Sequence, residues 1–286
     1  FGGDGDDTLI AGNNTGAGDS LSGGAGDDYL VDSFWNATLD GGTGSDLFEL
    51  GYGNATVIGG EDVGNTDSDL IDFQVANDAV NILYTGDEAG TYTDSDGDSG
   101  QFSQIEAIIL TDNADTVNAT ADSAGVVLIG NDGNDLLTGG QGDDFIEGGA
   151  DNDSIAGGAG NDTLNGGSGQ DTIFGGDGAD SINSGSGNDT VDGEVGNDQI
   201  DGSFGDDLLT GGEGNDTLLG GSGNDTIEGG AGDDLLVTGS YGGAFATSND
   251  AGGNTNVVSG GDGNDTILAS VGADTLSGDA GDDSID

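Results

Sequence analysis

Between residues 130 and 237, one aliphatic residue recurs every nine positions within a background of glycine, aspartate and small polar residues. The repeating unit is G-G-x-G-x-D-x-U-x, where U is aliphatic, and it occurs twelve times without a gap. The sixth position is aspartate and the eighth is aliphatic in every copy. Repetition at a fixed short period is typical of a chain that stacks equivalent units. We therefore expect a solenoid in which each unit buries one side chain.

Each unit predicts a tight loop followed by a very short strand. Glycine disfavours a helix by about 1 kcal/mol per position, but it readily adopts the positive φ angles of tight loops. The last three residues, such as 163–165, alternate polar, apolar and polar, as in a strand with one buried face. A strand of three residues is stable only when it stacks on equivalent strands. The expected fold class is therefore an all-β parallel solenoid.

The aspartate column predicts a row of metal sites. A carboxylate beside loop carbonyl groups offers only oxygen ligands, which suit a hard cation such as Ca²⁺. The chain has no Cys, His or Met that would favour a softer metal. An isolated aspartate of this kind would more simply cap its own turn. Twelve in register favour cation binding, because stacked like charges repel unless a cation lies between them.

The nonapeptide resembles the RTX, or hemolysin-type calcium-binding, repeat. The resemblance implies a right-handed parallel β-roll with two nonapeptides per coil. It also implies several Ca²⁺ ions, held between the loops of successive coils by aspartate carboxylates and early loop carbonyls. Loop 130–135 would then share ions with loop 148–153, and loop 139–144 with loop 157–162. Members of this family leave the cell unfolded through a type I secretion channel and fold outside.

Eighteen units keep the sixth-position aspartate, and we predict all eighteen as metal ligands. They are Asp7, Asp28, Asp46, Asp135, Asp144, Asp153, Asp162, Asp171, Asp180, Asp189, Asp198, Asp207, Asp216, Asp225, Asp234, Asp265, Asp274 and Asp283. Some units depart from the glycine pattern, among them the four in which Asp151, Ser184, Glu194 or Ser203 replaces a glycine. We expect strain or weaker ion binding in those four.

The repeat pattern divides the chain into five segments. Residues 1–58 form an N-terminal roll segment with degenerate repeats, and residues 59–129 an irregular solenoid or β-insert. Residues 130–237 are the regular roll. Residues 238–259 hold a thirteen-residue loop insertion and a degenerate repeat, and residues 260–286 are the C-terminal repeats.

The irregular segment still predicts short strands from its β-branched and aromatic runs. We expect them at Leu70–Phe73, Val80–Tyr84, Phe102–Leu110, Thr116–Ala119 and Val126–Ile129.

An acidic loop at residues 94–100 begins like an EF-hand loop, D-S-D-G-D-S-G. It lacks the required glycine at position six, which is Ser99, and the glutamate at position twelve, which is Ile105. An additional calcium loop and a solvated turn both remain open interpretations.

Aromatic residues interrupt the repeats at Phe34 and Trp35 and again at Tyr241 and Phe245. Exposed aromatics can form a platform for a ligand or a sugar. Packing against the roll is the favoured interpretation, because large aromatic side chains are usually buried.

The chain carries 57 acidic residues and no Lys, Arg or His. Catalytic triads, Schiff-base chemistry and phosphate clamps are thereby excluded. A pair of carboxylates could still hydrolyse glycosides, and the candidates are Glu49, Glu61, Glu88 and Glu106. Solvated surface acids are the favoured interpretation of these four, and we expect no enzyme.

The net charge of −57 also bears on partners, because it repels nucleic acid and anionic lipid. We expect no nucleic-acid partner and no membrane insertion. Calcium is the expected partner. A further copy of the chain, stacked end to end or laterally, and a cell-surface glycan are two more candidates. Neither end shows a capping segment, which fits a piece of a longer protein or a unit that stacks.

These observations predict a calcium-dependent structural module of a secreted or cell-surface bacterial protein, of an adhesin, surface-layer or filament type. The alternative is a carbohydrate-binding or carbohydrate-active accessory domain of an RTX exoenzyme. Low hydrophobicity combined with high net charge usually means disorder. We therefore expect the metal-free chain to be largely unfolded and metal binding to drive folding.

Overall fold

The computed structural model describes residues 1–12, 18–34, 36–60, 68–76, 78–239, 254–270 and 272–286. Every regular element in these ranges is a β-strand, and no helix in them could cross a membrane. The chain forms two compact units: unit 1, Phe1–Gln141, and unit 2, Gly142–Asp286.

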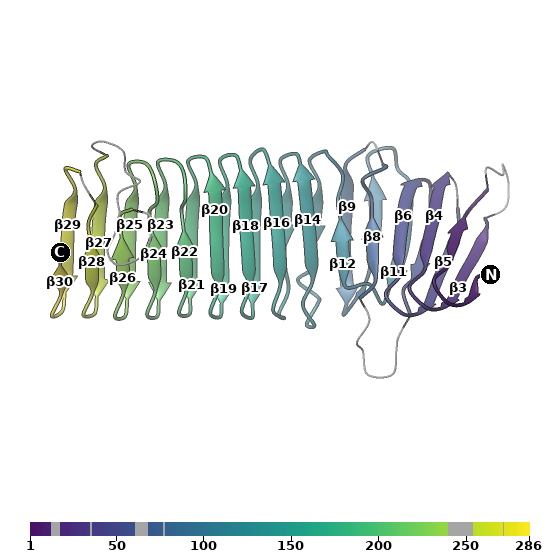
Figure 1. Ribbon diagram of the computed structural model, residues 1–286, viewed down its shortest axis with the longest axis horizontal. Helices are drawn as coiled ribbons and strands as arrows, with labels where there is room; N and C mark the ends of the chain where they lie inside the picture. The colour runs from purple at the N-terminus through teal and green to yellow at the C-terminus, as the bar shows by residue number, and fades with distance from the viewer. Residues whose placement is uncertain (13–17, 35, 61–67, 77, 240–253, 271) are drawn as a thin grey trace. The chain divides into compact units, whose positions relative to one another are not determined.

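Unit 2 is built from short strands that alternate between two parallel sheets (Figure 1). One sheet has the order β17 (Ser154–Ala159), β19 (Thr172–Asp177), β21 (Thr190–Val195), β23 (Leu208–Glu213), β25 (Thr226–Ala231), β27 (Val257–Asp262) and β29 (Thr275–Ala280). The other has the order β16 (Phe145–Ala150), β18 (Thr163–Ser168), β20 (Ser181–Ser186), β22 (Gln199–Asp201), β24 (Thr217–Leu219), β26 (Leu235–Val237), β28 (Thr266–Leu268) and β30 (Ser284–Ile285). Each coil thus contains two nonapeptides, and the predicted all-β parallel solenoid is confirmed.

The core of unit 2 is the eighth-position column of the repeat. Ile155 pairs in register with Ile173, and Leu164 with Ile182, each 18 residues apart. These side chains are at most 2% exposed, whereas the neighbouring seventh-position residues point outward. Ile227 pairs with Val258, 31 residues on, so the register resumes after the thirteen-residue insertion.

Unit 1 also has two sheets. One has the order β1 (Gly3–Asp4), β3 (Ser20–Ala25), β5 (Thr38–Thr43), β7 (Thr56–Ile58), β11 (Ser99–Ser103), β10 (Ala89–Asp94), β9 (Val80–Gly86), β13 (Thr116–Asn118) and β15 (Leu136–Thr138). The other has the order β2 (Thr8–Ile10), β4 (Tyr29–Phe34), β6 (Leu47–Tyr52), β8 (Leu70–Asp72), β12 (Ala107–Ile109) and β14 (Val127–Asp132). All pairs in the second sheet are parallel, so the solenoid continues through the irregular segment on that side.

On its other side, unit 1 departs from the solenoid. Strand β10 pairs antiparallel with both β9 and β11. The sequence did not predict β10. The single strand predicted over Phe102–Leu110 was also wrong, because the chain turns between β11 and β12 and those strands lie in different sheets. Gln104 at the turn has φ +60°, and Ile105 after it is fully buried, which explains the broken alternation.

The antiparallel strands bring an aromatic core that the regular repeats lack. The rings of Phe73 and Tyr92 pack edge to face at 5.1 Å, as do those of Tyr84 and Phe102. All four side chains are at most 4% exposed. Buried aromatic pairs of this kind contribute more than their area alone. This part of unit 1 is therefore held by apolar packing to a degree that the glycine-rich coils are not.

Candidate metal centres

The sixth-position aspartates point into the protein. Fifteen of the eighteen predicted ligands are at most 3% exposed, and Asp7, Asp274 and Asp283 are half-buried. A buried carboxylate is normally neutralised by a cation or by several hydrogen-bond donors.

One oxygen of each carboxylate belongs to a ladder between coils. Oδ1 of Asp162 accepts the backbone N–H of Asp144 at 2.8 Å, and Oδ1 of Asp180 accepts that of Asp162 at 2.8 Å. The same bond recurs along both sides of unit 2, at 2.8–3.1 Å. The loops with Asp144 and Asp162 are thus neighbours in one row, as the repeat predicts.

The other oxygen, Oδ2, is buried without a hydrogen-bond partner in ten of these aspartates. They are Asp7, Asp28, Asp162, Asp171, Asp180, Asp198, Asp207, Asp216, Asp234 and Asp265. Leaving a buried acceptor without a donor costs about 1–3 kcal/mol, and more for a charged group. A row of such oxygens fits cation ligands.

The first-position glycines shape the space beside these oxygens. A Cβ built on Gly157 would lie 2.2 Å from Oδ2 of Asp162 and 2.7 Å from the carbonyl oxygen of Gly175 in the next coil. At Gly175 the corresponding distances are 2.5 Å to Asp180 Oδ2 and 2.8 Å to the Gly193 oxygen. The missing side chain thus lets a carboxylate and a carbonyl from two coils converge, which suits Ca²⁺.

Carboxylates alone do not complete a site. Within the described ranges, no group of three or more acidic side chains could hold a metal ion. An ion bound beside these aspartates would need further ligands, and the backbone carbonyls that lie next to Oδ2 are the candidates.

In the absence of metal, burial raises the proton affinity of several of these carboxylates. It raises the pKa of Asp162, Asp198 and Asp207 to about 7, and that of Asp171 and Asp234 to about 6. Neighbouring aspartates in the row add to the effect by charge repulsion.

A pH dependence follows from the raised pKa values. Without metal, the fold binds protons that the unfolded chain, with pKa values near 3.8, does not bind. The stability of the metal-free fold should therefore fall as the pH rises from about 4 to about 7. We expect metal-free protein to gain β-structure on acidification, measured by far-ultraviolet circular dichroism. Calcium-loaded protein should instead release ions on acidification, because protons compete for Oδ2. Loss of β-signal from metal-free protein on acidification would contradict this assignment.

A second ladder runs along the exposed fifth positions, and the sequence did not predict it. Oδ1 of Asn161 accepts the backbone N–H of Ala179 at 3.0 Å, and Oδ1 of Asn215 that of Asp233 at 2.7 Å. These bonds point to the following coil, whereas those of the sixth position point to the preceding one. A loop with Asn or Asp at the fifth position is therefore tied to both neighbouring coils.

Some ladder members were missed because they lack the glycine pattern, among them the following three. Oδ1 of Asp69 accepts the Asp46 N–H at 2.7 Å, and Oε2 of Glu106 accepts the Asp69 N–H at 2.6 Å. Asn256 takes the sixth position between Asp225 and Asp274. A search for an acid or amide two residues before a core aliphatic would have found all three.

Asn256 is a natural break in the predicted ion row. Its Oδ1 accepts the Asp225 N–H at 2.8 Å, which keeps the ladder, but its Nδ2 donates to Asp274 Oδ1 at 3.1 Å. We expect Asn256→Asp to add about one Ca²⁺ per chain and to raise the free energy of unfolding by about 1–3 kcal/mol at saturating calcium. Plasma mass spectrometry of the desalted protein counts the ions.

The matched control for Asn256→Asp is Asn215→Asp, at a fifth position in a ladder where Asp233 already serves as an acceptor. It should bind no additional ion. Equal ion counts in the two variants would contradict the role of Asn256.

The predicted departures from the glycine pattern carry strain in three cases. Asp151, Glu194 and Ser203 have φ angles of 76°, 69° and 63°, where side chains are disfavoured. Ser184 is different, because its buried hydroxyl donates to the Gly202 carbonyl at 3.0 Å.

The acidic loop at residues 94–100 closes the turn between β10 and β11. Oδ1 of Asp94 accepts the N–H groups of Gly97 and Asp98 at 2.9 and 2.8 Å. This geometry is that of an aspartate capping its own turn.

The candidate catalytic glutamates that the structure describes lie in separate elements. Glu49 in β6 accepts the Tyr29 hydroxyl, Glu88 lies in the β9–β10 turn with φ +52°, and Glu106 belongs to the ladder. Trp35, Glu61, Tyr241 and Phe245, and the side chain of Phe34, lie outside the described residues.

Comparison with known proteins agrees with the geometry. No curated protein matches the chain. The family described as RTX calcium-binding nonapeptide repeat (four copies) matches at residues 129–164, 156–191, 165–200, 174–209, 210–240 and 250–285. These matches span more than half of the 286 residues. The chain therefore belongs to the family of RTX calcium-binding repeat proteins.

Proposed function

We propose that this chain is a calcium-dependent structural module of a secreted or cell-surface bacterial protein, which folds when it meets extracellular calcium. The observation that carries the proposal is the row of buried Oδ2 atoms, each beside a carbonyl of the next coil. The sixth-position aspartates are the proposed ligands. The proposed role is structural rather than catalytic, supported by the lack of His, Cys, Lys and Arg.

A calcium titration tests this proposal. Extracellular calcium modules bind with dissociation constants of about 10⁻⁴–10⁻³ M. We expect β-signal in circular dichroism and compaction in small-angle scattering to appear cooperatively in this range, and to be absent with excess chelator. A chain that remains folded in chelator would refute the proposal. Scattering in the same series reports self-association, which an adhesin, surface-layer or filament role would require.

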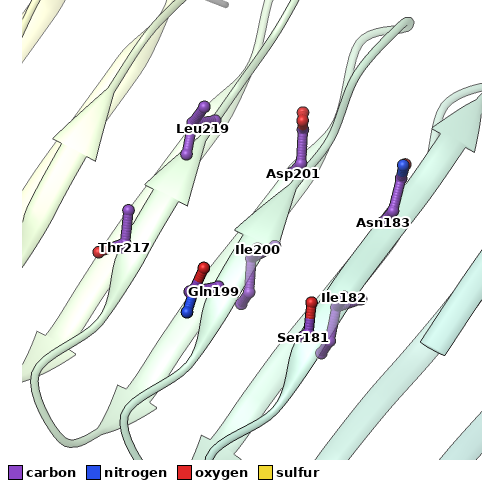
Figure 2. A pocket seen from close by; sticks show the side chains of 8 residues that line it. All are labelled: Ser181, Ile182, Asn183, Gln199, Ile200, Asp201, Thr217 and Leu219. Carbon is purple, nitrogen blue, oxygen red and sulfur yellow. The ribbon is translucent and has the colours of Figure 1, made fainter. Parts of the chain in front are cut away.

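Carbohydrate binding is a second candidate, favoured by one groove on unit 2. The groove has a volume of about 330 Å³ and crosses β20, β22 and β24. Figure 2 shows the side chains around it. Its polar and apolar outward residues are Ser181, Asn183, Gln199, Asp201, Thr217 and Leu219. Hydroxyl, amide and carboxylate groups on adjacent strands can hydrogen-bond sugar hydroxyls.

A glycan array with calcium-loaded protein separates the two functions. Binding that is lost in Gln199→Ala but kept in the exposed control Gln170→Ala would support the groove. Loss in Trp35→Ala or Tyr241→Ala would instead support the aromatic loops. Absence of glycan binding leaves the structural role alone.

A further inference from the structure

The two sides of unit 1 differ in their sixth-position residues. On one side, Asp7, Asp28, Asp46 and Asp69 form a ladder like those of unit 2. On the other side, two successive coils place alanine there, Ala37 and Ala55, which are 6% and 5% exposed. Alanine offers no oxygen to a cation, so this side must be held in another way.

At Ala55 the missing ladder acceptor comes from β10. The Tyr92 hydroxyl accepts the Ala55 backbone N–H at 2.8 Å, which is the role of aspartate Oδ1 in unit 2. Tyr92 is 4% exposed and packs against Phe73. Burial raises the pKa of Tyr92, so the hydroxyl stays neutral at physiological pH. A neutral acceptor completes the ladder without a charge that requires a cation.

At Asp115 the protein itself supplies donors to both oxygens. Oδ1 accepts the Val80 N–H at 2.6 Å, as in the ladder. Oδ2 accepts the Thr111 N–H at 2.8 Å and the Thr111 hydroxyl at 2.9 Å. The corresponding oxygens of Asp171 and Asp207 in unit 2 are buried without such donors. Thr111 therefore satisfies the oxygen that would otherwise face a cation.

The residue before Thr111 also fills the space beside the carboxylate that the first-position glycine leaves open in unit 2. Leu110 occupies the first position of this unit, where the regular repeat has glycine, and its side chain is fully buried. In unit 2 a side chain at this position would collide with Oδ2 and with the next coil's carbonyl, as at Gly175. Leu110 and Thr111 thus fill the place that the glycines leave open.

We infer that protein groups take the place of the cation at Ala55 and Asp115, so that the hairpin segment, residues 78–119, stays ordered at calcium concentrations too low to fold unit 2. The inference rests on the proposed calcium dependence of unit 2. Antiparallel pairing and the aromatic core supply the remaining stability, because both form between residues close in sequence. The chain then responds to calcium in two stages.

Hydrogen exchange on the full chain, read by mass spectrometry across free calcium, tests the inference. In excess chelator we expect amides of β9 and β13 to exchange at least about 100-fold more slowly than those of β19 and β21. Loss of protection in all four strands at one calcium concentration would overturn the inference and leave the calcium dependence standing. Protection of β19 and β21 in chelator would instead refute the proposed function.

Two variants remove the hydroxyl groups that are inferred to take the place of the cation. Tyr92→Phe and Thr111→Val should each lower protection of the hairpin segment in chelator by about 10-fold or more, with an unchanged number of bound ions at saturating calcium. The matched controls remove the same hydroxyl groups from outward-facing side chains. They are Tyr29→Phe, where the Tyr29 hydroxyl donates to Glu49, and Thr190→Val on β21. Unchanged protection in Tyr92→Phe and Thr111→Val would refute the role of these two side chains.

Discussion

Replacing Asp198 by asparagine is expected to remove bound calcium from unit 2 while leaving the hydrogen-bond ladder in place. The asparagine Oδ1 can still accept the Asp180 N–H, which lies 2.8 Å from Asp198 Oδ1. The amide nitrogen would replace Oδ2, the buried oxygen without a partner, and an N–H donor repels a cation. The chain already shows this arrangement at Asn256.

The expected loss in the free energy of unfolding follows from the linkage between ion binding and folding. A site with ligand at 100 times its dissociation constant adds about 2.7 kcal/mol to the free energy of unfolding. We therefore expect Asp198→Asn to lose one or two ions and at least about 2.7 kcal/mol, measured by urea unfolding at saturating calcium. In chelator the sign should reverse above pH about 7, because the variant removes a buried carboxylate whose ionisation destabilises the metal-free fold.

The control is Asp177→Asn, which makes the same change at an exposed third position. It should leave both the ion count and the urea midpoint unchanged. If Asp198→Asn also leaves both unchanged, Asp198 is not a ligand.

The second large effect is expected for Gly178→Ala. A Cβ on Gly178 would lie 1.6 Å from the carbonyl oxygen of Gly160 in the preceding coil, and its φ of +149° is rarely adopted by other residues. Both backbones would have to move, in a stack where every coil repeats the same spacing. We expect a loss of about 3 kcal/mol or more at saturating calcium, measured by urea unfolding.

Gly86→Ala is the control for this substitution, because a Cβ at Gly86 has nothing within 4 Å. It should change the free energy of unfolding by less than about 1 kcal/mol. Equal losses in the two alanine variants would show that the coils are not packed as closely as described.

The sixth and eighth columns made most of the fold predictable. An aliphatic residue such as Ile173 and an aspartate such as Asp171, two residues apart and repeated every nine, fix the buried face, the loop and the stacking together. The parallel solenoid and the buried aspartate rows follow directly from that repetition.

The remaining features depend on contacts between distant residues that leave no period. Tyr92 reaches the Ala55 amide 37 residues away, and the run A-G-T-Y-T-D, although Thr and Tyr favour strands, belongs to no repeat that would give its pairing. The fifth-position ladder was hidden for another reason. Asparagine and aspartate are common in any turn, so residues such as Asn161 suggest local capping, whereas they bond the next coil.

Because the two ladders bond in opposite directions, the coils of unit 2 are equivalent repeats that could replace one another in the stack. Loops with Asn or Asp at the fifth position offer the same acceptors forward and backward, so deleting or duplicating 18 residues between such loops would leave each new junction with the partners of the old one. In such a linear array stability is roughly a sum over neighbours. Gene duplication and unequal recombination could therefore lengthen or shorten the protein one coil at a time without redesign of its interior.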